Sequence, residues 1–243
     1  MKLVKKMLIT AAAGVLMLAL GGCGAQMSVV SPSRQLVEGS FDFVGPIRRI
    51  ESSIAGDIVI TAENSNTITY TADENFVSYL DMSVSNGVLS IRSDGATVTG
   101  DMQVTINVGT AVLEHLSISG VANVTGNGTF TADAFTIRVS GVANAELDVS
   151  ANDVDINLSG VGGIILSGET GSLSIVNSGV GHVDTRALIA QNATVTNSGV
   201  GSVNVYAAST LEINASGMGP VVYYGSAQPR INRSGFSSVE RGD

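Results

Sequence analysis

This sequence has few of the residue types on which most catalytic and stacking sites depend. Its 243 residues include no tryptophan, two histidines, one cysteine and four prolines. One cysteine excludes a disulfide bond within the chain, so the fold has to be stabilised by burial of apolar groups. Aromatic residues make up 5% of the chain and offer little ring surface for stacking sugars or bases.

Positive charge is also scarce beyond the first few residues. The only lysines are Lys2, Lys5 and Lys6, so from Cys23 onward nine arginines face 21 acidic residues, a net charge of −12. Such a surface repels phosphate groups, which disfavours nucleic acids and anionic headgroups as partners.

The N-terminus has the pattern of a secretory signal. After the lysines, residues 7–20 form an apolar run that is too short for an ordinary transmembrane helix. The run ends in Leu20-Gly21-Gly22-Cys23, which resembles the lipobox of bacterial lipoproteins, where the cysteine becomes residue one and carries lipid such as palmitate. We predict a lipoprotein signal peptide over 1–23, lipidated at Cys23, rather than a plain secretory peptide. Gly24, in place of aspartate, resembles sorting to an outer membrane.

The rest of the chain divides into a tether and a single domain. Residues 24–40 contain Ser31-Pro32-Ser33 and no apolar periodicity, which predicts a flexible tether. From Phe41 to Asp243, short runs rich in β-branched residues alternate with turn residues, and no segment has a helical period. This pattern predicts one all-β domain over 41–243.

A Ser-Gly pair recurs seven times in the C-terminal half and defines the architecture. Its glycines are Gly120, Gly141, Gly160, Gly179, Gly199, Gly217 and Gly235, separated by 21, 19, 19, 20, 18 and 18 residues. A period of about 19 residues predicts a parallel β-helix, a β-solenoid with one coil per repeat. We expect right-handed coils, because parallel β connections are almost always right-handed.

Aligning the repeats on these glycines predicts which positions face inward. Four residues before the glycine stand Leu116, Ile137, Ile156, Ile175, Val195, Ile213 and Ile231. One residue after it stand Val121, Val142, Val161, Val180, Val200, Met218 and Phe236. Four residues after it stand Val124, Ala145, Ile164, Val183, Val203, Val221 and Val239. All three columns are expected in the core, with the glycine at a corner that needs a positive φ or is crowded by neighbouring coils.

Two polar residues interrupt an otherwise apolar column. Asn177 and Asn197 stand two residues before their glycines in adjacent coils. An amide ladder would satisfy both side chains, and a buried polar ligand site is the alternative.

These units resemble the head GIN domain family, whose members are described as putative auto-transporter adhesins. The resemblance covers about Phe41 to Val239 and rests on the Ser-Gly units, on the opening Arg49-Ile50-Glu51-Ser52-Ser53-Ile54-Ala55-Gly56-Asp57-Ile58, on Asp73-Glu74-Asn75 and on the closing Tyr224-Gly225-Ser226-Ala227-Gln228-Pro229. It implies an exported β-helical domain, often behind a lipoprotein signal, and brings no catalytic residues.

No constellation in the sequence predicts catalysis, a metal or a cofactor. His115 and His182 are 67 residues apart in different columns, and the densest acidic run is Glu146, Asp148, Asp153 and Asp155. We interpret that run as a solvated face; a calcium site there would lack the glycine-rich nonapeptide of β-rolls. A polysaccharide-processing enzyme that uses these acids is the least favoured alternative.

We therefore expect a lipid-anchored, non-enzymatic adhesion or scaffold module of the bacterial cell envelope. Its partner would be an envelope or host glycan or protein, met through outward polar residues: Asn123, Asn144, Asp155, His182 and Arg138. A glycan platform at Tyr223 and Tyr224 is a weaker possibility, as is recognition of the terminal Arg241-Gly242-Asp243. The alternative function is a periplasmic glycan- or envelope-binding stress factor.

Overall fold

The computed structural model describes residues 28–243, so the predicted signal peptide, Cys23 and residues 24–27 lie outside the described chain. The described part consists of eighteen strands and one short 3₁₀ helix, η1 (Val77–Tyr79). The first nine strands are β1 (Ser28–Val30), β2 (Leu36–Asp42), β3 (Arg49–Ser52), β4 (Ala55–Thr61), β5 (Thr67–Asp73), β6 (Leu80–Ser85), β7 (Val88–Ser93), β8 (Ala96–Val98) and β9 (Val104–Gly109). The others are β10 (His115–Ile118), β11 (Val121–Val139), β12 (Val142–Leu158), β13 (Val161–Asn177), β14 (Val180–Asn197), β15 (Val203–Ala215), β16 (Met218–Tyr224), β17 (Gln228–Arg233) and β18 (Phe236–Arg241). No helix within residues 28–243 is long and apolar enough to cross a membrane.

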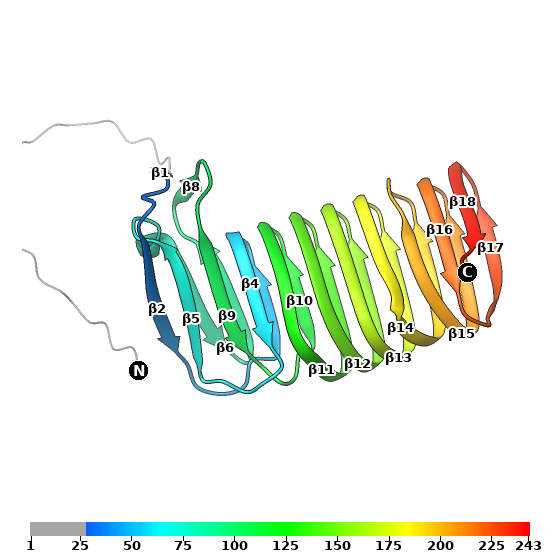
Figure 1. The fold of residues 1–243 in the computed structure, drawn as a ribbon, viewed down its shortest axis with the longest axis horizontal. Helices are drawn as coiled ribbons and strands as arrows, with labels where there is room; N and C mark the ends of the chain where they lie inside the picture. Colours follow the sequence, from blue (N-terminus) through cyan, green and yellow to red (C-terminus); the bar gives the residue numbers. More distant parts are fainter. Residues whose placement is uncertain (1–27) are drawn as a thin grey trace, which may run out of the picture.

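The strands stack into an elongated β-solenoid of about seven turns (Figure 1). Each long strand pairs in parallel with the strand of the next coil, so that β12 and β13 run from Val142 opposite Val161 to Leu158 opposite Asn177. Partners in this pair are therefore 19 residues apart, which confirms the predicted fold class and coil length. The register shifts between Ile165 and Ser167 and again after Thr185, where single coils take up extra residues.

The repeated glycines stand at corners where successive coils approach closely. A Cβ added at Gly141, Gly160 or Gly179 would overlap the carbonyl oxygen of the corner glycine one coil earlier. Gly235 alone among the seven corner glycines has a positive φ, 71°. Crowding by the neighbouring coil, rather than backbone conformation, therefore explains glycine at most corners.

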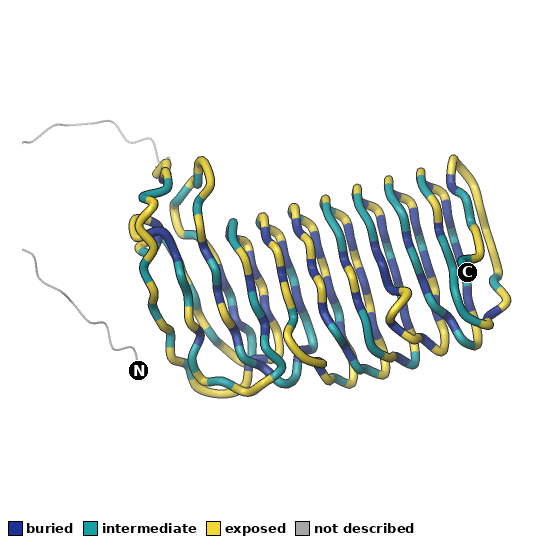
Figure 2. The backbone as a smooth tube through the Cα atoms, in the orientation of Figure 1, coloured by how far each residue is buried: buried dark blue, intermediate teal, exposed yellow. Residues whose placement is uncertain are grey.

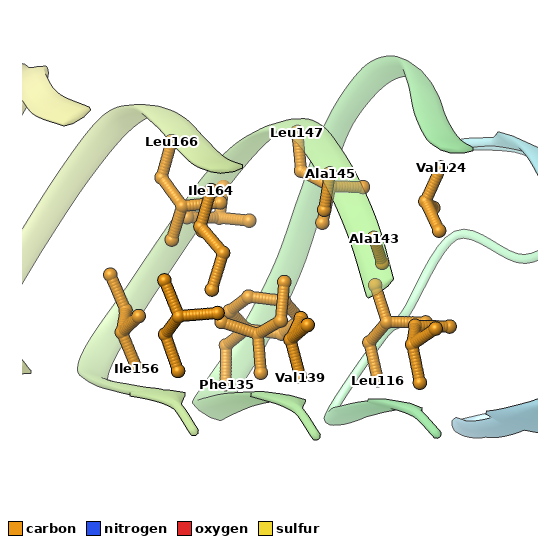
Figure 3. Packing of buried hydrophobic residues seen from close by; sticks show 14 of the residues in the cluster. Leu116, Val124, Phe135, Val139, Ala143, Ala145, Leu147, Ile156, Ile164 and Leu166 are labelled. Carbon is orange, nitrogen blue, oxygen red and sulfur yellow. The ribbon is translucent and has the colours of Figure 1, made fainter. Parts of the chain in front are cut away.

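The core lies between the two walls of the coil, as predicted for two of the three aliphatic columns. The column from Leu116 to Ile213 is at most 1% exposed, and the column from Val124 to Val221 is at most 2% exposed. Figure 3 shows Leu116, Val139 and Ile156 on one wall pointing toward Val124 and Ile164 on the other. The alternation of buried and outward residues continues along the stack (Figure 2).

The prediction for the third column, from Val121 to Phe236, is wrong. These seven side chains are 43% to 87% exposed and follow the outside of the corner. The reason is the period of a strand: with Ala143 and Ala145 turned inward, Val142 has to point outward. The chain therefore displays a continuous row of apolar side chains, which we call the corner row.

The predicted tether over 24–40 also needs correction where the structure describes it. β2 pairs with β5 along its full length in antiparallel orientation, and β1 pairs with β8. Between them the buried Asp73 carboxylate accepts hydrogen bonds from the Arg34 backbone N–H at 2.7 Å and the Gln103 backbone N–H at 2.8 Å. These bonds, the one from Gln103 foremost, hold the pKa of Asp73 below its usual value although burial opposes the shift. Residues 28–40 thus belong to the folded domain.

The two ends of the stack are built differently. At the N-terminal end β5 pairs antiparallel with β2 and β9, β6 pairs antiparallel with β7, and Phe76 is fully buried. At the C-terminal end β17 pairs with β15, β18 pairs with β16, and neither pairs with a further strand within residues 28–243. Among the aromatic residues, Phe76 is covered at the first end, whereas Phe236 is 87% exposed at the second.

Candidate functional site

A shallow groove lies beside the corner row where β12, β13 and β14 and the segment before β15 lie side by side. Its volume is about 700 Å³. Val161, Val180 and Val200 of the corner row form one rim, and Glu146 and Ile165 lie on the other side. The exposed lining is mostly apolar, which is unusual for an outward-facing surface and is typical of a binding surface.

Glycines form the floor of the groove for a steric reason. A Cβ at Gly162, Gly181 or Gly201 would overlap the backbone of the preceding coil, so only the smallest residues fit this position once the coils are in contact. Gly163 differs, because a Cβ there would lie 3.2 Å from the Asn144 side-chain oxygen and would meet no backbone at short range. The absence of a side chain at Gly163 is what opens the groove between Asn144 and His182.

Polar side chains line the groove on both sides of this gap. Asn144 donates to Asn123 at 3.2 Å, and Asn123 donates to Asp57 at 3.0 Å, which forms an exposed ladder across three coils. Beyond the gap, His182 Nδ1 and Ser202 Oγ share a hydrogen bond of 2.6 Å. Asn123, Asn144 and His182, which the repeat pattern predicts to face outward, all lie along this one groove.

Asp184 and Arg186 extend this polar line along β14. Arg186 Nη2 and Nε donate to the Asp184 carboxylate at 2.6 Å and 3.0 Å. Burial alone would raise the pKa of Asp184, but the hydrogen bonds from Arg186 outweigh it and the pKa lies below the usual value. Asp184 is therefore a carboxylate held by an arginine, not an acid available for proton transfer.

The order Ser202, His182, Asp184 invites comparison with a nucleophile, base and acid. His182 Nε2 lies 3.6 Å from Asp184 Oδ2, beyond the hydrogen-bond distance that orients a catalytic base. The carboxylate is instead directed at Arg186. The arrangement suits recognition of a polar ligand group better than activation of the serine.

The other residues singled out in the sequence lie elsewhere. Arg138 and His115 line a separate hollow on the other wall, where burial first, and then Arg138 and Arg49, lower the pKa of His115. Asp155 is paired with Thr136 beside that hollow, whereas Glu146 lies at the groove. The acidic run of β12 is thus divided between two walls, and no group of three or more His, Cys, Asp or Glu within residues 28–243 could hold a metal ion.

The tyrosine pair does not form one platform. Tyr223 packs against the core, and Tyr224, the next residue of β16, points to the opposite side of the strand. The terminal tripeptide is tied to the last coil: Arg241 Nη2 donates to the Gly225 carbonyl at 3.1 Å and the Gly242 N–H donates to the Tyr223 carbonyl at 2.9 Å.

Asn177 and Asn197 form the predicted amide contact inside the coil. Both are fully buried, and Asn177 Nδ2 donates to Asn197 Oδ1 at 3.1 Å. Asn197 Nδ2 in turn donates to the Gly201 carbonyl at 3.3 Å, which links the ladder to the floor of the groove.

The parallel coils, with an outward groove and a row of apolar corner residues, define a β-solenoid. The chain belongs to the family described as "Putative auto-transporter adhesin, head GIN domain", whose profile matches residues 48–227. Comparison with curated proteins found no match.

Several solved structures share the fold. A putative adhesin from Bacteroides fragilis is 21% identical with a TM-score of 0.78, over 87% of this chain and 99% of that one. A putative adhesin from Parabacteroides distasonis is 20% identical with a TM-score of 0.71, over 88% and 100% of the two chains. Another P. distasonis protein, described as a putative lipid binding protein, is 17% identical with a TM-score of 0.62, over 89% and 100%. The family's description as an adhesin indicates a protein of the cell surface or envelope.

Proposed function

We propose that this protein is a lipid-anchored, non-enzymatic adhesion or scaffold module of the cell envelope, and that the groove beside the corner row is its binding face. The observation that carries the proposal is the row of half-exposed valines along a groove of about 700 Å³. A bound partner that covered these apolar side chains would remove them from water, which is favourable.

The groove favours a ligand with both apolar and hydrogen-bonding groups. Val161 and Val180 offer methyl groups, while Asn144, His182 and Ser202 offer donors and acceptors within the same surface. Glu146 and the acidic charge of the chain disfavour anionic ligands. A neutral glycan bearing acyl groups, or a segment of a partner protein, meets these requirements; nucleic acid does not.

Support for the anchor comes from the sequence alone. The Leu20-Gly21-Gly22-Cys23 pattern would place lipid on Cys23, five residues before β1, and Gly24 favours the outer membrane. Cys23→Ser should leave the domain folded and move it from the membrane to the soluble fraction. Unchanged membrane partition would contradict the anchor.

Binding is tested by screening the protein against a panel of envelope and host glycans and envelope proteins. Val180→Asp, which charges the rim of the groove, should abolish any binding found, because a buried unpaired charge is costly. Ile189→Asp is the matched control, since Ile189 is similarly exposed but lies at a different hollow. Equal loss in both variants, or release of oligosaccharides from the panel, would overturn the proposal. Protection from protease in intact cells would favour a periplasmic envelope-binding role instead.

A further inference from the structure

The core is uncovered at the C-terminal end of the stack. Ile231 occupies the inward column whose six other members are at most 1% exposed, yet Ile231 itself is 43% exposed. β17 covers the coil before it, and within residues 28–243 no strand covers β17. The end therefore presents an apolar residue that every other coil buries.

The backbone is uncovered at the same place. β17 and β18 each contribute six residues and pair along one edge only. Apart from Pro229, whose nitrogen has no hydrogen, these strands present backbone donors and acceptors that a further strand would pair. An unpaired strand edge beside exposed core residues is a template for β-sheet addition.

The charge of this end distinguishes it from the rest of the surface. Residues 228–243 carry Arg230, Arg233 and Arg241 against Glu240 and Asp243, so their side-chain charges nearly cancel. The chain from Cys23 onward has a net charge of −12. Two copies therefore repel each other least when they approach through their C-terminal ends.

We propose that two copies of this chain associate end to end through β17 and β18, and that the sheets continue across a two-fold axis. A two-fold axis perpendicular to both the stack and the strands reverses strand direction, so the strands would pair in antiparallel orientation across the interface. Pairing would cover Ile231 and the open backbone edges of both copies together.

End-to-end pairing extends the proposed function, and the role of the pair at the membrane rests on the lipid anchor proposed there. β1 and β2 lie at the opposite end of the stack from β17 and β18 (Figure 1). In an end-to-end pair the two N-terminal ends point away from each other. With lipid at Cys23 the pair would bridge two membranes, so the partner on an opposing membrane would be a second copy of the same protein.

Sedimentation equilibrium of the full chain in detergent micelles tests the pairing itself, whether or not the anchor is correct. The wild-type protein should form dimers as its concentration rises. Ile231→Lys should weaken dimerisation at least about tenfold, because it places a charge at the centre of the interface. Ile189→Lys is the matched control, because Ile189 is an isoleucine of the same exposure, 42% against 43%, but lies in β14, away from this end. Its dimerisation should equal that of the wild type.

A wild-type protein that stays monomeric up to about 100 μM, a concentration that detects even weak association, would overturn the proposal. So would a dimer that Ile189→Lys dissociates and Ile231→Lys does not. If Ile231→Lys changes the circular dichroism spectrum, Phe236→Ser at the same end replaces it, since Phe236 is 87% exposed. Vesicles carrying the chain should cluster, and clustering should be lost with Ile231→Lys. Dimers in micelles with dispersed vesicles would leave the pairing standing and contradict adhesion between membranes.

Discussion

The N-terminal region and the coils after it use the same strands in different ways. From β10 onward every strand pair is parallel and each coil covers its neighbour. Before β10 the chain folds back on itself, and the antiparallel pairs of β2 with β5 and of β6 with β7 close the stack. A solenoid must keep its core from water. Within residues 28–243 the inward column is exposed at the C-terminal end, at Ile231, whereas at the other end β2 and β6 leave their outer edges unpaired but Phe76 is fully buried.

The variant with the largest expected effect tests whether the side chains of the column from Leu116 to Ile213 fill the core. Ile156→Asp buries a charge without a partner between the two walls and should cost about 3–5 kcal/mol of unfolding free energy. Ile165→Asp is the matched control, because Ile165 is 44% exposed one coil away. Denaturant unfolding measures both. Similar losses in the two variants would mean that the walls are wrongly assigned.

The variant with the next largest expected effect tests whether the neighbouring coil leaves no room for a side chain at a corner glycine. Gly160→Ala places a methyl group against the Gly141 backbone and should cost about 3 kcal/mol, since backbone in a stacked coil has little room to move. Gly163→Ala, in the same coil, meets only the Asn144 side chain at 3.2 Å and should change stability far less. Thermal melting of both proteins checks this. A Gly160→Ala protein as stable as Gly163→Ala would show that the corner glycines have another cause.

A smaller effect separates the two asparagine ladders. Asn197→Ala leaves the buried Asn177 amide without its partner and should cost about 1–2 kcal/mol. Asn144→Ala removes a member of the exposed ladder and should stay within about 0.5 kcal/mol of the wild type. Chemical unfolding distinguishes them. Equal stabilities would indicate that the inner ladder contributes no more than the outer one.

The smallest expected effect concerns Asp73 in the N-terminal region, whose contribution to stability depends on pH. The folded-state pKa of Asp73 is depressed, so its stabilising contribution is present above the unfolded pKa of about 3.9 and is lost as the pH falls through the folded value. Asp73→Asn should lower Tm at pH 7, and the difference from the wild type should shrink below about pH 4. Asp81→Asn, at an exposed position of β6, is the matched control and should leave Tm at pH 7 close to the wild-type value. A constant Tm difference across this range would contradict the role given to Asp73.

The repeat explains both what the sequence predicted and what it missed. The coil length and the columns of Ile156 and Ile164 were predictable because the same spacing recurs in every coil. Apolar character alone predicts the corner row inside, whereas alternation counted back by two from Ala145 turns Val142 outward, as the structure has it. β2 was missed because its pairing with β5 is not repeated anywhere in the chain.

The site was partly predictable for the same reason. His182 and Ser202 each stand three residues after a corner glycine, so their contact follows from the coil length and could have been found. Gly163 stands in the same column, so the gap there could also have been found, whereas the pairing of Asp184 with Arg186 depends on how side chains fill one particular coil. No repeat pattern carries that information.

Amide hydrogen exchange along the chain, measured at low and at high protein concentration, tests most directly the claim that one end is closed and the other open. In dilute protein the amides of β17 and β18 should exchange faster than those of β13 and of β5, and concentrating the protein should slow them alone. Exchange in β17 and β18 as slow as in β13 in the dilute sample would contradict an open end.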